Sequence, residues 1–309
     1  MDNFFTVAQQ VLILFVLIGA GALMRRTRLV PDRAIEGFVN LLILVVTPCL
    51  IVDVFQRPFD PSMLKGLGMA FAIGSLGHVA VIALAYLCVR HRDEAVRRPL
   101  MLAAVFSNAG FMGLPLEQAL LGDAGVFYGI VYVVVFNLFM WSWGLNVMKR
   151  EKTGALNLKT VINPGTVGIA FGLPLFFLSV KLPAVVAVPI HQIANLNTPL
   201  AMIVIGYCLL GARLGRVVRM PSVYVATFVR LVAYPLLVVL AMYPFRHSLD
   251  RNLMLAMTIA ASAPVAAMVS MFATKFGRDV DVAVAVVCGT TLLGVVTMPA
   301  VIAFAMAVL

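Results

Sequence analysis

One short stretch of the chain combines a polar side chain with three residues that weaken a helix. Asn108 is followed by Gly110, Gly113 and Pro115 within an otherwise apolar run. Each glycine costs about 1 kcal/mol relative to alanine in a helix, and proline removes a backbone hydrogen bond. We therefore expect an interrupted helix here. The interruption would leave backbone N–H groups and the Asn108 amide available to an anion.

A second interruption is predicted in the other half of the chain. Ser262 and Pro264 lie within the stretch 261–267, which is otherwise composed of alanine and valine. A hydroxyl group beside a proline offers a second, weaker polar group to the same kind of ligand. The two interruptions are the main candidates for a binding site.

The composition places both interruptions in a membrane. Of the 309 residues, 62% are hydrophobic and 12% are charged, whereas ordinary soluble domains have about 45–50% and about 25%. A soluble fold could not cover so much apolar surface. Soluble enzymes, disordered tails and nucleic-acid binders are therefore excluded, and the predicted class is an all-α integral membrane protein.

Ten apolar runs are long enough to cross a bilayer as helices, for which about 20 residues are needed. They cover residues 4–24, 34–55, 63–89, 99–121, 123–148, 163–180, 184–212, 222–244, 252–275 and 280–306. The first run lacks the basic start of a cleaved signal peptide and is expected to be a transmembrane helix.

Basic residues predict the orientation of these helices. The loops after odd-numbered helices hold 17 of the 23 Lys and Arg residues, and the loops after even-numbered helices hold 5. The positive-inside rule then places the odd loops in the cytoplasm and both termini outside, in an inner or plasma membrane. The net charge of +10 is thus a signal of topology.

The two halves of the chain share short motifs in the same order. Thr47-Pro48 recurs as Thr198-Pro199, and the sequence Leu-Met-Leu-Ala occurs at 100–103 and again at 253–256. Both spacings are close to half the length of the chain, which favours an internal repeat over chance.

An odd number of helices in each half makes the repeat inverted. Residues 1–148 and 163–309 each contain five predicted helices, joined by a cytoplasmic linker at 149–162. The second half must then enter the bilayer from the opposite side, as in many secondary transporters. The interruptions lie in corresponding helices, 99–121 and 252–275, a pairing that points to a binding site. The alternative is a pair of proline kinks that serve packing alone.

Several motifs resemble those of one known family, the auxin efflux carriers. The stretch NAGFMGLPL at 108–116 is similar to the crossover motif of that family. Further similar stretches are INPGTVGIAFGLPL at 162–175, NTPLAMIVIGYCL at 197–209, RLVAYP at 230–235 and SAPVAAM at 262–268. The connection between the fifth and sixth helices is short, so the chain looks closer to the bacterial malonate or carboxylate permeases than to plant auxin exporters.

The resemblance implies a fold and a division of labour. The family belongs with the bile acid–sodium symporters, and its fold crosses the broken fourth and ninth helices. Helices 1, 2, 6 and 7 would form a scaffold, while helices 3–5 and 8–10 would form a moving transport domain. Asn108 would contact a small organic anion beside Gly110, and Pro115 and Pro264 would hold the breaks open.

Polar residues of the seventh helix could complete this substrate site. His191, Asn195 and Thr198 are spaced so that they share one face of a regular helix, with Asn197 close by. That face could line a cavity opposite Asn108. It could equally join helices by interhelical hydrogen bonds.

Five ionisable residues in or near the membrane are candidates for coupling transport to an ion: His78, His191, Glu117, Asp53 and Arg230. Each also has a structural interpretation. His78 could be a packed imidazole bonded to a carbonyl. We expect Glu117 and Asp53 to lie at an interface, and we expect Arg230 to snorkel towards the cytoplasm.

These observations predict a secondary active transporter of the elevator type for a small carboxylate, such as a dicarboxylate or an auxin-like acid. The alternatives are a cation-coupled symporter of a larger anion, a channel, and a sensor with a transporter fold. An enzyme is not expected, because no protease or hydrolase motif occurs. We expect no cofactor or metal, apart from coupling H⁺ or Na⁺. Lipid is an expected partner, and a homodimer is left open.

Overall fold

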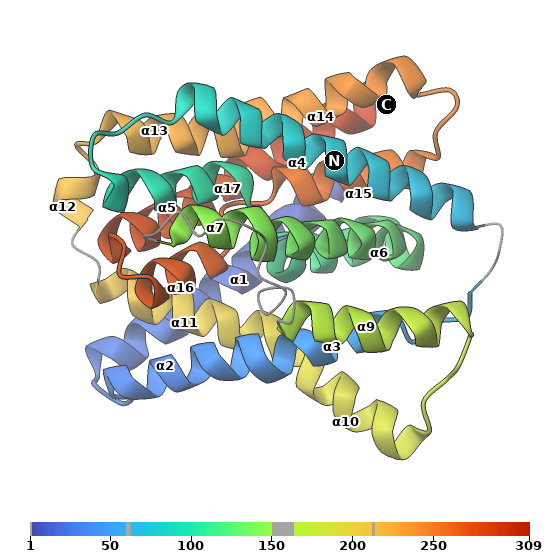
Figure 1. Cartoon of the computed structure of the whole chain (residues 1–309), viewed down its shortest axis with the longest axis horizontal. Coiled ribbons are helices and arrows are strands. Elements are labelled where there is room, and N and C mark those ends of the chain that lie inside the picture. The colour runs from blue at the N-terminus through green and yellow to red at the C-terminus, as the bar shows by residue number, and fades with distance from the viewer. Residues whose placement is uncertain (1, 60–62, 150–163, 212–213) are drawn as a thin grey trace. The chain divides into compact units, whose positions relative to one another are not determined.

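The computed structural model describes residues 2–59, 63–149, 164–211 and 214–309, and their regular elements are all helices (Figure 1). Apart from Lys149, the linker predicted at 149–162 lies outside these residues. The described chain forms two compact units. Unit 1 contains residues 2–13, 66–149, 211 and 214–309, and unit 2 contains residues 14–59, 63–65 and 164–210. The all-helical part of the predicted fold class is confirmed for the described chain.

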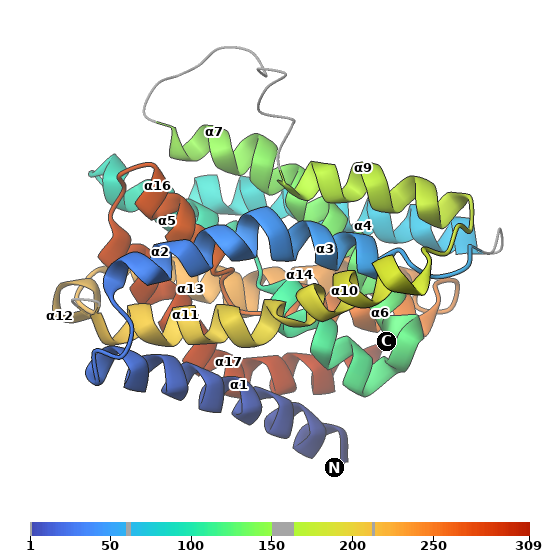
Figure 2. The same ribbon diagram turned by 90° about the horizontal axis from the view of Figure 1, so that it is seen from below.

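Unit 2 contains most of the first helix, a continuous helical stretch made of α2, η1 and α3, and three later helices. Its elements are α1 (Asp2–Arg26), α2 (Asp32–Leu41), the π-helical turn η1 (Leu42–Val46), α3 (Thr47–Val54), α9 (Pro164–Phe177), α10 (Ala184–Asn195) and α11 (Asn197–Gly211). The helix α3 packs against α9 and α10, and Figure 2 shows α9 alongside it.

Glycines allow the close helix contacts in unit 2. A Cβ atom on Gly168 would lie 3.0 Å from the Cβ of Ile51, and one on Gly172 would lie 2.7 Å from the Phe55 ring. The pair Gly168/Gly172 therefore packs α9 against α3 within one chain. It gives no support for a dimer.

Unit 1 is built from the remaining helices. They are α4 (Met63–Cys88), α5 (Glu94–Val105), η2 (Ala109–Gly113), α6 (Leu114–Phe139), η3 (Met140–Gly144), α7 (Leu145–Met148), α12 (Leu214–Val217), α13 (Pro221–Phe228), η4 (Val229–Ala233), α14 (Tyr234–Met242), η5 (Tyr243–Phe245), α15 (Arg251–Ser262), α16 (Met268–Lys275) and α17 (Val280–Val308). The helix α6 is kinked at Gly122, where φ is 63° and ψ is −154°.

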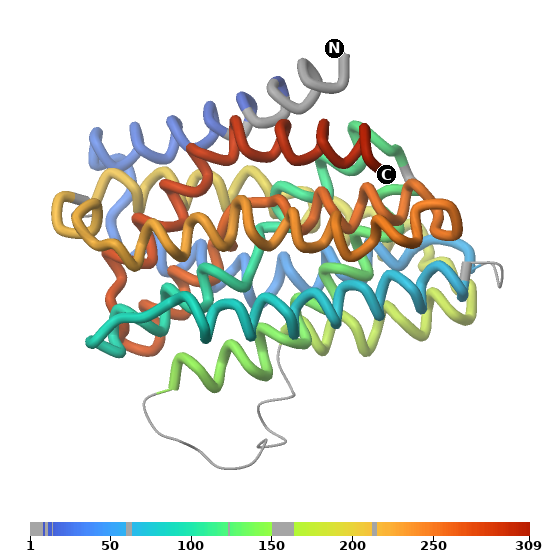
Figure 3. The backbone as a smooth tube through the Cα atoms, turned by 90° about the horizontal axis from the view of Figure 1, so that it is seen from above, coloured from blue at the N-terminus to red at the C-terminus, as the bar shows by residue number. Residues whose placement is uncertain are grey.

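The core of unit 1 surrounds α5 and α15. Residues 99–105 of α5 and 253–262 of α15 are all buried. Apart from Thr258 and Ser262, both segments are apolar around their circumference, which is typical of a helix enclosed by others. The helix α15 packs against α6, α14 and α17, and Figure 3 traces the long α17 in red to the C-terminus.

Three of the π-helical turns come directly before an X-Pro pair. The N–H of the residue before each proline reaches back five residues, from Thr47 to Leu42, from Leu114 to Ala109 and from Tyr234 to Val229. A proline ring clashes with the carbonyl four residues earlier in a regular helix. A wider turn relieves that clash, so these prolines explain where the helices widen.

Six described helices are long and apolar enough to cross a membrane. They cover Asp32–Val54, Leu64–Cys88, Ala124–Met148, Ala184–Gly211, Pro221–Phe245 and Val280–Val308. The predicted runs 99–121 and 252–275 are each divided by a break, and α9 has only 14 residues. The described chain is therefore that of a multi-pass membrane protein.

Candidate binding site at the paired interruptions

The two predicted interruptions are joined by backbone hydrogen bonds. The first covers residues 106–108, between α5 and η2, and the second covers 263–267, between α15 and α16. The N–H of Asn108 donates to the carbonyl of Pro264 at 2.7 Å, and the N–H of Ala266 donates to the carbonyl of Phe106 at 3.0 Å. Ser107 and Val265 form an antiparallel bridge. The breaks thus satisfy each other's backbone groups.

The helices before the two breaks are built alike. Each has 12 residues and begins at an aspartate whose side chain accepts backbone N–H groups. Asp93 accepts from Ala95, whereas Asp250 accepts from Asn252 and Leu253. Such N-caps fix where a helix starts, so the two breaks come at matching distances along their helices.

The helices after the breaks also end alike. The helical segment after the first break runs to the kink of α6 at Gly122, with φ of 63°, and α16 is followed by Gly277, with φ of 59°. A positive φ is adopted at little cost by glycine alone. Both glycines therefore stop their helices and let the chain turn into the next one.

Asn108 supplies a buried donor that has no partner among the described residues. Its side chain is 2% exposed, and its Nδ2 makes no hydrogen bond to any described residue. A Cβ atom on Gly110, two residues further along the chain, would meet nothing within 4 Å, so the backbone is open at that position. An unpaired buried donor costs about 1–3 kcal/mol, a cost that an anion bound there would remove.

The other residues predicted for the substrate site occupy different roles. Pro264 lies inside its break, and its carbonyl accepts the backbone N–H of Asn108. Pro115 lies in the first turn of α6, where a missing N–H costs little. The Ser262 hydroxyl is buried and donates to the carbonyl of Ile259, at 2.9 Å, within its own helix. Ser262 is thus already satisfied locally.

Arg230 lies at the centre of unit 1. Its Nη1 donates to the carbonyl of Val105 at 2.7 Å, and its Nη2 donates to the carbonyl of Ala261. These carbonyls belong to the last turns of α5 and α15, where the helix dipoles concentrate negative charge. Because Arg230 is 0% exposed, the expected snorkelling is wrong. The planar guanidinium fork can serve both helix ends at once.

Hydroxyl groups support the breaks from neighbouring helices. The Ser107 hydroxyl lies 3.3 Å from the hydroxyl of Tyr132, which lies 3.2 Å from that of Tyr234. The Arg230 guanidinium stacks 4.7 Å from the Tyr234 ring centre. Thr290 of α17 accepts the N–H of Val265 at 3.1 Å. Sequence patterns did not single out Tyr132 or Thr290, because isolated hydroxyls are common in apolar helices.

Two coupling candidates are buried in unit 1. The Nδ1–H of His78 donates to the carbonyl of Gly74 at 2.8 Å, and the imidazole stacks on Phe139, with ring centres 5.1 Å apart. This is the geometry of a packed imidazole. Glu117 is 0% exposed, so its expected interfacial position is wrong. It lies one turn after η2, inside the unit.

The Glu117 carboxyl group fills a space that a glycine leaves open. A Cβ atom on Gly129 would lie 1.5 Å from its Oε2. Neither carboxyl oxygen has a hydrogen-bond partner in the part of the chain that the structure describes. The two glycines Gly125 and Gly129 of α6 therefore lie against Leu121 and Glu117, which come earlier in the same helix.

The remaining candidates lie in unit 2. The Nδ1 of His191 lies 3.0 Å from Oδ2 of Asp53, which joins α10 to the end of α3. The helix is irregular after Asn195, because the N–H of Leu196 bonds back only three residues, to Ile193. Asn195 is exposed and Thr198 is half-buried.

Asn197 differs from these neighbours. It is buried, and its Oδ1 has no partner among the residues described. Asn197 therefore does not lie with the exposed His191 and Asn195. The role of that face opposite Asn108 stays a prediction.

A comparison with known protein families defines the class. The family model described as membrane transport protein matches residues 6–157 and 150–302, which include both interruptions. The chain belongs to this family, and the resemblance to auxin efflux carriers predicted from the motif at Asn108 is confirmed. No curated protein matches the chain significantly. The protein is thus a multi-pass membrane transporter by family.

Proposed function

We propose that the protein is a secondary active transporter that moves a small organic carboxylate by alternating access and binds it at the paired interruptions. The observation that carries this proposal is the buried Nδ2 of Asn108, a hydrogen-bond donor without a described partner. A carboxylate is a strong acceptor for such a donor.

The helix that starts at Ala109 adds to the attraction. The first N–H groups of a helix lack partners within it, and the dipole favours negative charge at that end. Arg230 occupies the opposite helix ends, at Val105 and Ala261. The Arg230 charge is thereby used to hold these two helix ends, which leaves Asn108 as the direct donor to the substrate.

We further propose the ten-helix inverted repeat. The broken fourth helix would comprise α5, η2 and the first part of α6, and the broken ninth helix would comprise α15 and α16. Three features support this correspondence: equal 12-residue half-helices, matching Asp caps and an antiparallel bridge between the breaks. Antiparallel pairing is what an inverted repeat requires of two crossing breaks. The excess of basic residues in the odd loops supports termini outside the cytoplasm.

The two compact units support an elevator mechanism. Apart from residues 2–13, unit 1 holds the predicted helices 3–5 and 8–10, and unit 2 holds helices 1, 2, 6 and 7. These are the transport domain and the scaffold that the family resemblance implies. Under this proposal, unit 1 carries the substrate bound at Asn108.

Reconstitution tests the proposal. Purified protein in proteoliposomes should take up or release radiolabelled malonate, or another member of a mono- and dicarboxylate panel, with saturable kinetics. Asn108→Ala should abolish this flux and weaken binding about tenfold or more, from the loss of a hydrogen bond to a charged group worth about 1.5–3 kcal/mol. Unchanged kinetics in this variant would refute the site.

Asn137→Ala is the matched control. Asn137 is also buried in unit 1, but its Nδ2 already donates to the carbonyl of Val133 in its own helix. This variant should keep substrate binding. Binding without flux in the native protein would indicate a sensor, and a large cholate-type anion as the preferred substrate would indicate the larger-anion symporter.

Coupling is tested with the same vesicles. Separate gradients of pH, Na⁺ and voltage should show which ion drives flux. The buried carboxyl of Glu117 is the proposed proton carrier, so Glu117→Gln should remove stimulation by a pH gradient and leave substrate exchange at equilibrium intact. A sodium-driven flux that is unaffected by this substitution would rule out that role.

A further inference from the structure

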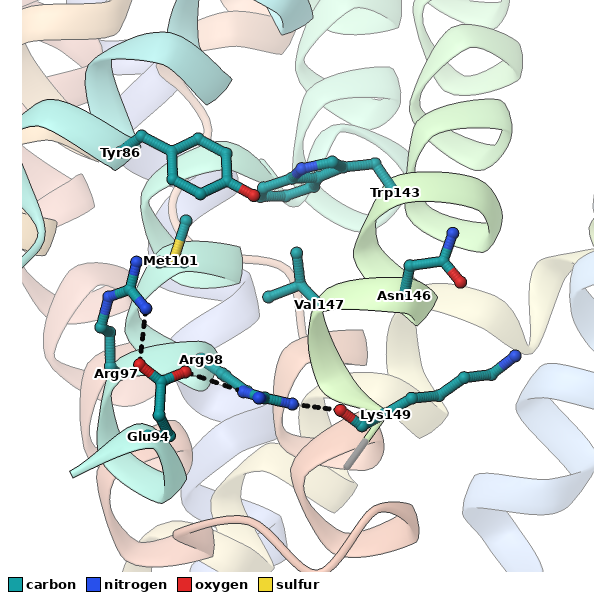
Figure 4. Close-up of a pocket in the computed structure, with 9 residues that line it drawn as sticks. All are labelled: Tyr86, Glu94, Arg97, Arg98, Met101, Trp143, Asn146, Val147 and Lys149. Atoms are coloured by element: carbon teal, nitrogen blue, oxygen red, sulfur yellow. Dashed lines mark hydrogen bonds and ion pairs between the residues drawn. The ribbon is translucent and has the colours of Figure 1, made fainter. Parts of the chain in front are cut away.

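Unit 1 contains a cavity of about 290 Å³, distinct from the paired interruptions, between the end of α4, the first turns of α5 and the η3–α7 segment (Figure 4). Its volume is just below the range for pockets that hold drug-sized molecules, about 300–1,000 Å³. In Figure 4 the rings of Tyr86 and Trp143 lie along one side, and a row of charged residues lies along the other. The pocket therefore has an aromatic wall and an ionic wall.

The ionic wall carries an excess of positive charge. Glu94 accepts hydrogen bonds from Nη1 of Arg97 at 2.6 Å and from Nε of Arg98 at 2.9 Å. Burial opposes ionisation of Glu94, but the bonds and charges of Arg98 and Arg97 together lower its pKa. The ammonium of Lys149 forms no ion pair with a described residue. The lining thus holds three cations and one carboxylate, and in Figure 4 the Lys149 side chain extends away from Glu94 and the arginines.

The two arginines are held in place by protein groups. Arg98 also donates through Nη1 to the backbone carbonyl of Lys149, which ties the start of α5 to the end of α7. A guanidinium fixed in this way loses little freedom when it binds an oxyanion, and its fork suits phosphate oxygens. Arg97 and Lys149 have the remaining donors for such a group.

The aromatic wall connects the pocket to an apolar helix face. Tyr86 and Trp143 meet edge to face, with ring centres 6.1 Å apart. Tyr86 is exposed and continues a stripe of α4 side chains at helical spacing, Leu76, Val79 and Leu87, which are 69%, 54% and 66% exposed. Tyrosine and tryptophan concentrate at the membrane–water interface, so this stripe fits acyl chains.

We propose that the pocket binds the headgroup of an anionic phospholipid, with the phosphate against the ionic wall and an acyl chain along the α4 stripe. A soluble phosphate compound shares the headgroup chemistry. The continuity of Tyr86 with the apolar stripe favours the lipid, and basic pockets on the cytoplasmic side of membrane proteins bind such headgroups. The site does not depend on the identity of the transported substrate.

Native mass spectrometry and thermal unfolding of the full chain in detergent test this proposal. Phosphatidylglycerol should remain bound and raise the melting temperature, whereas phosphatidylcholine should do neither. The double variant Arg97→Gln/Lys149→Gln should bind phosphatidylglycerol about thirtyfold more weakly, because each basic residue near a membrane surface is worth about a factor of five. Lys149→Gln alone should weaken binding about fivefold and leaves the ion pairs of Glu94 with Arg97 and Arg98 intact.

The matched control is Arg90→Gln/Arg92→Gln, which removes the same charge from exposed residues just before α5 and outside the pocket. This control should bind phosphatidylglycerol like the native protein. Equal losses in the control and pocket variants would show diffuse surface attraction and overturn the site. Stabilisation and competition by glycerol 3-phosphate or inorganic phosphate at the same concentration would overturn the assignment to a lipid. Failure of substrate transport in proteoliposomes would leave this measurement unaffected.

Discussion

The backbone N–H of Asn108 lies 2.7 Å from the carbonyl oxygen of Pro264 and donates a hydrogen bond to it. The residue with the unpaired side-chain amide is thus fixed by the break in the other half of the chain. Neither break can shift alone without losing this bond and the one between Ala266 and Phe106. We infer that the two breaks move as one rigid part of unit 1.

The Asn108 side chain should tolerate no negative charge. Asn108→Asp keeps the size of the residue but replaces the donor with a carboxylate, which repels an anionic substrate in a buried setting. We expect no detectable carboxylate binding at pH 7 in a thermal-shift titration. Asn108→Ser, which retains a small donor, should still bind weakly. Equal affinity in the Asp variant and the native protein would contradict the proposed contact.

Arg230 should be required for stability more than for charge attraction. Arg230→Met leaves the carbonyls of Val105 and Ala261 without their donor and should lower stability by about 3–6 kcal/mol, since hydrogen bonds to charged groups are worth about 1.5–3 kcal/mol each. Unfolding in detergent, followed by circular dichroism, measures the change.

Arg246→Met is the control for Arg230. Arg246 stacks on Tyr243 at 4.1 Å near the end of α14, where a cation–π contact contributes about 0.5–1 kcal/mol. Its loss should therefore cost much less. If the two variants melt at the same temperature, Arg230 does not hold the two helix ends.

Sequence patterns predicted the location of the breaks but not the network that holds them. Glycine and proline weaken a helix wherever they occur, so Asn108–Pro115 and the stretch at Pro264 could be recognised from local chemistry alone. The partners of a break are distant in the chain, and a single sequence does not show them. Arg230 and Thr290 are such partners.

The wrong expectations have the same origin. Arg230 and Glu117 were expected near an interface because charge is costly inside a membrane. For Arg230 the structure compensates this cost with the carbonyls of two helix ends. These carbonyls are free to accept because both helices are broken nearby. For Glu117 it provides a space opposite Gly129. Both depend on contacts between separate segments.

Glu94 should make the pocket lined by Tyr86, Trp143 and Arg97 sensitive to acid. Its pKa is lowered in the folded protein by Arg98 and Arg97 against the opposing effect of burial. The stabilisation is therefore present above the ordinary carboxyl pKa and is lost as pH falls through the lower folded value. Glu94→Gln should melt below the native protein at pH 7, and the difference should shrink below about pH 4. A constant difference from pH 7 to pH 3 would exclude this origin.

The contact between Gly129 and Glu117 can be tested by a pair of substitutions. Gly129→Ala places a methyl group where the Glu117 carboxyl lies and should destabilise the protein by about 1–3 kcal/mol, as overpacking of a filled core does. Glu117→Ala removes the obstructing group, so Gly129→Ala should cost little in that background. Chemical unfolding of the native protein, both single variants and the double variant gives the interaction free energy. Additive effects would mean that the two residues do not touch, and Glu117 would then have room to reach another partner.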